Sequence, residues 1–182
     1  VLKRVFFMKK EFIHIPDFEE PSELEIRYTI PEDITPLTQW LKEPGVLRWF
    51  PMEEQKEIDD SIKRWIGFHK YQCSLTATLN GTPCGISTLW LQPYRKVSHQ
   101  CQFGILVDSS YRGKNIGSSL LKNLIHLAKN YFKIELLHLE VYEGNPAYRL
   151  YKRFGFKEFG RQSHWIKQEG EYIARIFMER FI

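Results

Sequence analysis

The stretch from Phe103 to Leu121 constrains the fold more than any other part of the chain. An apolar run at 103–107 is followed by a polar turn, a basic loop that contains glycine, and a helical pattern of apolar residues. This order is typical of a buried strand that leads through a loop into a helix. The free N–H groups and the dipole of a helix start favour a negatively charged ligand. Because Arg112 and Lys114 add positive charge to the same loop, the sequence predicts a cradle for phosphate groups.

The motif in this loop narrows the kind of ligand. It reads Arg112-Gly113-Lys114-Asn115-Ile116-Gly117, which is neither a P-loop pattern nor the Gly-x-Gly-x-x-Gly of dinucleotide-binding folds. It resembles the acyl-CoA-binding motif of the GNAT superfamily of N-acetyltransferases, Arg/Gln-x-x-Gly-x-Gly/Ala. Arg112 and Gly117 match that motif, and Asn115 replaces its first glycine. Asparagine tolerates left-handed backbone angles better than most residues, so we expect the loop to form.

A second segment, residues 134–156, resembles a later element of the same family. That element is a strand, an asparagine, a short helix that carries Ala and Leu-Tyr, and then Gly-Phe. Two motifs in the right order make coincidence improbable, and with the flanking elements the resemblance covers residues 24–182. The matching positions are Leu139, Val141, Asn145, Ala147, Leu150, Tyr151, Gly155 and Phe156.

The remaining patterns predict an α/β (α+β) fold. We expect a GNAT-like, mixed and mostly antiparallel twisted sheet of about six to seven strands, flanked by about four helices, with a parallel pair around the cofactor helix. Asn80-Gly81 stands between two strand-like runs and predicts a hairpin turn. Residues 24–182 are expected to form a single acetyltransferase domain, and residues 1–23 an N-terminal extension.

Composition favours one packed enzyme domain. The chain has 182 residues, 43% of them hydrophobic, which is enough for a substantial core. Its three cysteines are odd in number and lie in apolar runs, so neither a disulfide framework nor a zinc site is expected, and no metal is predicted. A net charge of +4 with scattered basic residues does not favour nucleic acid, and no run of residues is long enough to span a membrane. We therefore expect a cytoplasmic protein that binds neither nucleic acid nor membrane.

The resemblance implies acetyl-CoA as cosubstrate and assigns roles to particular residues. Two neighbouring strands are expected to separate near 103–107 and 137–142 and to pair with the pantetheine arm through their backbones. Asn145 is expected to hydrogen-bond the pantetheine or to cap the helix that Pro146 begins. The cofactor-binding residues implied are Ile105, Leu106, Val107, Arg112, Gly113, Lys114, Asn115, Ile116, Gly117, Ser118 and Asn145.

The acid and the base of the reaction differ in how clearly the sequence shows them. Tyr151 is the candidate general acid, because the family motif places its hydroxyl near the thiol sulfur; the alternative is a packed aromatic side chain. The base is less defined. Gln102 stands where the family often has Glu, so a water molecule is the default and Glu140 the candidate carboxylate. His138 and His99 are further alternatives.

The amine acceptor is the least constrained part of the prediction. Trp49, Glu53 and Glu54 lie in the region that lines the acceptor side in the family, and the acids there would attract a cationic amine. A solvated helix start explains the same acids equally well. The acceptors considered are a small cationic amine such as a polyamine, a lysine, or a protein N-terminus.

Three function classes remain open on the sequence alone. The leading one is an acetyl-CoA-dependent N-acetyltransferase in which the amine attacks directly within a ternary complex. A non-catalytic acyl-CoA sensor of the same fold is the alternative, favoured by Asn115 and Gln102. A ribosome- or RNA-associated module is the third. The closing run at 172–181 is expected to be an apolar edge strand, which would either pair across a homodimer or be buried in the monomer.

Overall fold

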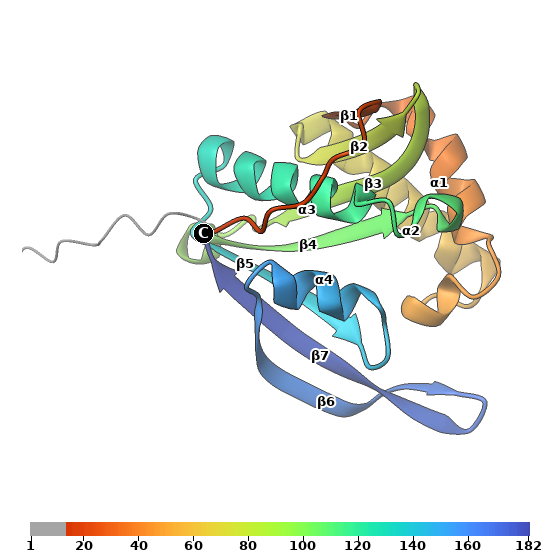
Figure 1. The fold of residues 1–182 in the computed structure, drawn as a ribbon. Helices are drawn as coiled ribbons and strands as arrows, with labels where there is room; N and C mark the ends of the chain where they lie inside the picture. The colour runs from red at the N-terminus through yellow and green to blue at the C-terminus, as the bar shows by residue number, and fades with distance from the viewer. Residues whose placement is uncertain (1–13) are drawn as a thin grey trace, which may run out of the picture.

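The computed structural model describes residues 14–182, which form one seven-stranded sheet with helices on both of its faces (Figure 1). The strand order is β1-β2-β3-β4-β5-β7-β6. β4 and β5 are parallel and the other neighbouring pairs are antiparallel, which confirms the predicted fold class. The strands are β1 (Leu24–Tyr28), β2 (Ser74–Leu79), β3 (Thr82–Leu91), β4 (Gln100–Val107), β5 (Leu136–Tyr142), β6 (Lys157–Gln168) and β7 (Glu171–Phe181).

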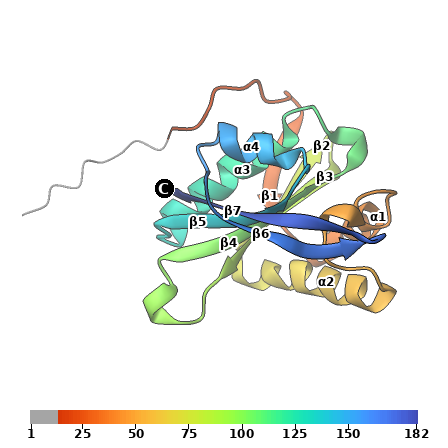
Figure 2. The same cartoon turned by 90° about the horizontal axis from the view of Figure 1, so that it is seen from below.

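The helices divide between the two faces of the sheet (Figure 2). One core packs α3 and α4 on the sheet and includes Leu120 and Tyr151, and a smaller core packs α1 and α2 and includes Trp40 and Trp65. β4 contributes to both cores because alternate residues of a strand face opposite sides. The helices are α1 (Ile34–Leu41), α2 (Gln55–Gly67), α3 (Ile116–His126) and α4 (Ala147–Arg153).

The hairpin between β2 and β3 forms where Asn80-Gly81 predicts it. Asn80 has a φ of 50° and Gly81 a φ of 74°, so both central residues adopt positive φ. A two-residue turn of this kind matches the twist of the strands that it joins. The turn therefore fixes the register of β2 on β3, and β3 in turn pairs with β4 along the length of the strand that leads to the cradle.

The closing strand is not an edge strand, so that part of the sequence prediction is wrong. β7 lies between β5 and β6 and pairs with both of them, because the turn at 169–170 folds β7 back between β6 and β5. The middle of β7 is buried within the chain at Ala174, Ile176 and Met178, whereas Tyr172 and Phe181 at its ends are exposed. β6 forms the edge of the sheet instead, and a homodimer stays a prediction.

Residues 14–23 approach the face that carries α3 and α4, and they carry no helix or strand before β1. Phe18 packs against Phe154 with ring centroids 6.1 Å apart, and the Glu20 carboxylate lies 3.3 Å from Lys122 Nζ. Asn115 donates a hydrogen bond of 2.9 Å to the Glu19 carbonyl. The described part of the predicted extension is therefore attached to the domain, and residues 1–13 lie outside the described range.

The cysteines are free and buried. Burial raises the pKa of Cys101 to about 12 and those of Cys73 and Cys84 to about 11, so these thiols stay protonated at neutral pH. Within residues 14–182 no group of three or more His, Cys, Asp or Glu side chains is placed to hold a metal ion. No helix of this part of the chain has the length and apolar character needed to cross a membrane.

Candidate functional site

The sheet opens between its two parallel strands. β4 and β5 pair at Gln100–Leu136, Cys101–Leu137 and Gln102–His138, and their pairing ends there. Beyond it the strands diverge (Figure 1), and a pocket of about 750 Å³ lies in the gap. Residues 103–107 therefore have β3 on one side and no strand on the other. A strand edge of this kind leaves backbone N–H and C=O groups free to bind an extended ligand.

The loop from β4 to α3 forms one wall of this pocket in the conformation that its sequence predicts. Gly113 has a φ of 75° and Asn115 a φ of 59°, so the residue that replaces the family glycine adopts the left-handed conformation. Arg112 Nε donates to the Val107 carbonyl at 3.2 Å, and Asp108 accepts from the Ser110 N–H at 2.8 Å. The two residues of the loop with positive φ are thus of types that tolerate it, and no β-branched or bulky residue of the loop has a strained backbone before α3 begins at Ile116.

Close packing of α3 and α4 depends on Gly117. A Cβ atom at this position would lie 3.3 Å from Leu150 Cδ2, which is tighter than an ordinary contact. About one turn after Leu150 on α4, the Arg153 guanidinium donates a hydrogen bond of 2.5 Å to Ser118 Oγ of α3, and this bond joins the two helices. Gly117, Ser118 and Arg153 all line the pocket, so a cation lies beside the helix start that the loop exposes.

Tyr151 lies on the α3–α4 side of the pocket. Its ring packs edge-on against Phe103 and Phe156, with centroid distances of 5.9 and 6.1 Å. Its hydroxyl has no hydrogen-bond partner within residues 14–182, and burial raises the pKa of the phenol well above its usual range. The phenol is therefore protonated at neutral pH, as a general acid must be.

Asn145 caps a helix and also lines the pocket. Its Oδ1 accepts a hydrogen bond of 2.9 Å from the Ala147 N–H at the start of α4. The capping alternative of the sequence analysis is thus present in the structure. A contact between the Asn145 side chain and pantetheine stays a prediction.

Glu140 lies on the opposite face of β5 from the Tyr151 cluster, because its neighbours Leu139 and Val141 point into the larger core. Its Oε2 accepts a hydrogen bond of 2.6 Å from Arg175. The Arg175 guanidinium also lies over the Trp165 ring, 3.4 Å from its centroid. The candidate base is therefore held by an ion pair on the α1–α2 face.

The structure brings most of the predicted residues together. Both candidate catalytic residues and Trp49 line the pocket, as do the cofactor residues other than Lys114. Lys114 Nζ instead donates to the Ser110 carbonyl at 3.2 Å. Neither of the alternative bases, His138 and His99, lines the pocket, and burial is the main reason that the His138 pKa is lowered. Gln102, which stands where the family often has Glu, does line it.

Glu53 and Glu54 do not join this site. They are exposed and lie outside the pocket lining, at the start of α2. Their backbone N–H groups donate to Glu57 Oε2 at 2.9 and 3.0 Å, and these bonds lower the Glu57 pKa. The acid with a structural use at this position is Glu57, whose carboxylate accepts these two bonds at the start of α2.

The sequence placed Trp49, Phe50 and Trp65 in the region of the acceptor side, but it did not predict that three further aromatic residues complete a wall of rings on the α1–α2 face. Trp90 of β3, Tyr142 of β5 and Trp165 of β6 line the pocket beside Phe50 and Trp65. Strand alternation was an available signal for Tyr142, because it is two residues after Glu140. Trp165 gave no such signal, since its position depends on how the β6–β7 hairpin folds over the sheet.

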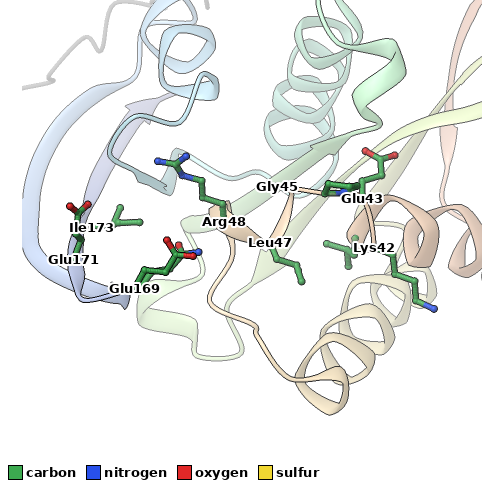
Figure 3. A pocket seen from close by; sticks show the side chains of 11 residues that line it. Lys42, Glu43, Gly45, Leu47, Arg48, Glu169, Glu171 and Ile173 are labelled. Carbon is green, nitrogen blue, oxygen red and sulfur yellow. The ribbon is translucent and has the colours of Figure 1, made fainter.

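A second pocket, of about 780 Å³, lies between the α1–α2 loop and the tip of the β6–β7 hairpin (Figure 3). The loop contributes Lys42, Glu43 and Arg48, and the hairpin contributes Glu169 and Glu171. None of the residues that line it belongs to the two sequence motifs. We therefore assign the chemistry to the pocket between β4 and β5.

Residues 34–156 match the model of the "Acetyltransferase (GNAT) family". The chain therefore belongs to the GNAT family of acetyltransferases. The sequence is 31% identical over 107 residues to the L-amino acid N-acetyltransferase AaaT of Escherichia coli (strain K12), a match that covers 58% of this chain and 66% of that protein.

A second relative is the spermine/spermidine N(1)-acetyltransferase of Bacillus subtilis (strain 168). It is 47% identical over 53 residues, which are 28% of this chain and 34% of that protein. The chain thus matches less than two thirds of the length of either curated relative.

Solved structures share the fold over nearly their whole length. A GNAT acetyltransferase from Streptococcus pneumoniae aligns with a TM-score of 0.73 at 24% identity, over 88% of this chain and 100% of that one. A structure described as yncA, a putative acetyltransferase from Salmonella typhimurium with its cofactor acetyl-CoA, aligns with a TM-score of 0.71 at 18% identity, over 87% and 94% of the two chains.

Proposed function

We propose that this chain is an acetyl-CoA-dependent N-acetyltransferase that acetylates a primary amine by direct attack within a ternary complex. One observation carries the proposal: a single pocket is lined by the unpaired edge of β4, the left-handed loop at Asn115 and Tyr151. These three features fit a long thioester with a pyrophosphate at one end. Membership of the GNAT family supports the same ligand.

Each feature has a role toward the cosubstrate. Acetyl-CoA, when bound, supplies an acetyl group activated as a thioester. The backbone of residues 103–107 would pair with the pantetheine arm, and a free N–H there would stabilise the negative charge that develops on the carbonyl oxygen. The start of α3, with Arg112, would bind the pyrophosphate. Tyr151 would donate its proton to the departing sulfur.

The acceptor amine would approach from the α1–α2 face. Glu140 lies on that side of β5, and the water-mediated base of the sequence analysis would act beside it. The named activities of the two curated relatives support an amino acid or a polyamine as acceptor, and a peptide N-terminus remains an alternative. The free, buried cysteines fit the reducing cytoplasm that we propose as its location.

Initial rates measured with two varied substrates test this function. Thiol release from acetyl-CoA is followed against a panel of amino acids, polyamines and N-terminal peptides, and the acetylated product is identified by mass. We expect release that depends on the amine, and double-reciprocal lines that intersect, as a ternary complex requires. Parallel lines would contradict direct attack, and release that does not depend on any amine would contradict the proposed function.

A further inference from the structure

The α1–α2 side of the pocket is a chamber walled by aromatic rings. Phe50 and Trp65 meet edge to face with centroids 6.5 Å apart, and Trp65 meets Trp90 in the same way at 6.0 Å. Gly104 makes room for this packing, because a Cβ there would lie 2.9 Å from Trp65 Cη2. We call it the acceptor chamber; its rings are those of Trp49, Phe50, Trp65, Trp90, Tyr142 and Trp165.

The charges around the pocket do not suit a polycation. Among residues 14–182, Glu140 is the one carboxylate that lines the pocket, and Arg175 already binds it at 2.6 Å. The lining cations are Arg64, Arg112 and Arg153. A polyamine needs a carboxylate for each further ammonium group, and here it would meet arginines instead.

Arg64 is the cation that belongs to the acceptor chamber. It stands on α2 directly before Trp65, whereas Arg112 is in the phosphate loop and Arg153 is bonded to Ser118. The Arg64 side chain is exposed, and within residues 14–182 it makes no hydrogen bond or ion pair. An arginine that is free at the rim of an apolar chamber can bind a carboxylate through two parallel hydrogen bonds.

We propose, on the basis of the N-acetyltransferase function proposed above, that the acceptor is an α-amino acid with an apolar or aromatic side chain. The aromatic rings bury the side chain, and the guanidinium of Arg64 binds the α-carboxylate. The α-ammonium group of the substrate, whose nitrogen is acetylated, is the cation in this arrangement. It lies among the aromatic rings and near Glu140. A polyamine offers neither an apolar side chain nor a carboxylate.

Matched acceptors test both parts of this inference in one assay: burial of the side chain in the acceptor chamber and binding of the α-carboxylate by Arg64. We compare L-phenylalanine, L-alanine, 2-phenylethylamine and spermidine at saturating acetyl-CoA. We expect L-phenylalanine to exceed both L-alanine, which lacks the ring, and 2-phenylethylamine, which lacks the carboxylate, by about tenfold or more in kcat/KM. Spermidine should be the poorest of the four. Spermidine as the best acceptor would overturn the inference and leave the proposed function standing.

Arg64→Gln removes the proposed carboxylate ligand without burying or exposing any apolar group. We expect KM for L-phenylalanine to rise about tenfold, with little change for 2-phenylethylamine. Lys63→Gln is the matched control, since Lys63 is an exposed cation on the same helix that does not line the pocket. An equal effect of both variants, or no effect of Arg64→Gln, would overturn the role of Arg64.

A binding measurement separates failure of this inference from failure of the proposed function. Tryptophan fluorescence of the CoA-saturated protein is titrated with L-phenylalanine and with spermidine, since four tryptophans line the pocket. L-Phenylalanine binding that Arg64→Gln weakens, with no turnover of any amine, would support this inference and contradict the acetyltransferase function. Tighter binding of spermidine would contradict this inference whatever the turnover.

Discussion

At the scale of single residues, Tyr151 is both a packed side chain and the proposed general acid. Its ring is part of the larger core, between Phe103 and Phe156, while the residue also lines the pocket. The packing that buries the ring also raises the pKa of the phenol, which keeps it protonated at neutral pH and able to donate a hydrogen bond or a proton to a departing thiolate. The two readings that the sequence left open for Tyr151 are therefore compatible.

Removing the Tyr151 hydroxyl should slow transfer and leave cofactor binding intact. We expect Tyr151→Phe to lower kcat by about a hundredfold, because a positioned general acid contributes on that order. The ring contacts remain, so calorimetry should give an unchanged Kd for acetyl-CoA. Tyr131→Phe, at an exposed position, serves as the control. Equal rates for Tyr151→Phe and wild type would remove Tyr151 from the mechanism.

Asn115 should tolerate glycine and resist alanine. Its φ of 59° costs alanine about 1 kcal/mol more than glycine, so Asn115→Ala should weaken acetyl-CoA binding several-fold by disturbing the loop. Asn115→Gly should bind at least as well as wild type, since it restores the family motif. The Kd values come from calorimetry. Weaker binding by the glycine variant would show that the Asn115 side chain, through its bond to the Glu19 carbonyl, matters more than its backbone angle.

At the scale of elements, two glycines let helices pack closely around the place where β4 separates from β5. Gly104 of β4 lets Trp65 of α2 lie against the strand, and Gly117 of α3 lets α4 approach on the other face. The sequence predicted β4, α3 and the hairpin turn well, since each has a local signal. It did not predict the aromatic chamber, because α2, β3, β5 and β6 meet there only through tertiary packing.

A methyl group at Gly104 should destabilise the fold and close part of the chamber. We expect Gly104→Ala to lower the free energy of unfolding by about 1–3 kcal/mol, because rigid aromatic rings at 2.9 and 3.2 Å must shift. Gly67→Ala is the control: no atom lies within 4 Å of its Cβ, and alanine there should be neutral or stabilising by up to about 1 kcal/mol. Urea unfolding measures both. Equal stabilities would contradict the close contact at Gly104.

At the scale of the whole molecule, a partly buried ion pair between Arg27 and Asp33 connects the first strand to the turn that follows it. Asp33 accepts two bonds from Arg27, at 2.7 and 2.8 Å, and further bonds from Thr76 and the Ile30 N–H. Burial by itself raises the Asp33 pKa, but these hydrogen bonds outweigh it and the net pKa is lowered. The carboxylate therefore stabilises the folded chain in its ionised form.

This network should make the protein sensitive to acid. The contribution of Asp33 is complete above its unfolded pKa of about 4 and is lost as pH falls through the lower folded value. We expect Asp33→Asn to lower the free energy of unfolding by about 2 kcal/mol at pH 7, and by much less near pH 3. Denaturation at several pH values measures this, with exposed Glu32→Gln as control. A difference from wild type that does not change with pH would contradict the assignment.

The sequence predicted best the features that neighbouring residues determine, and least well the features that depend on how the whole sheet is assembled. The left-handed Asn115 and the cap at Asn145 are set by neighbouring residues. The place of β7 inside the sheet is not, because strand order depends on pairing between segments far apart in the chain. The acids Glu53 and Glu54 suggested a site for a cationic amine, but they are exposed at a helix start, and it is their backbone N–H groups that bond there, to the Glu57 carboxylate.

Calorimetric titration of the protein with acetyl-CoA measures whether the gap between β4 and β5 binds this cosubstrate, as proposed. We predict one site per chain, with affinity that falls steeply when Gly117→Val fills the contact between α3 and Leu150 and that survives Tyr151→Phe. The Gly117→Val variant is first checked for folding by circular dichroism. The absence of heat from the folded wild-type protein, or equal affinity in Gly117→Val, would contradict the cradle and the function built on it.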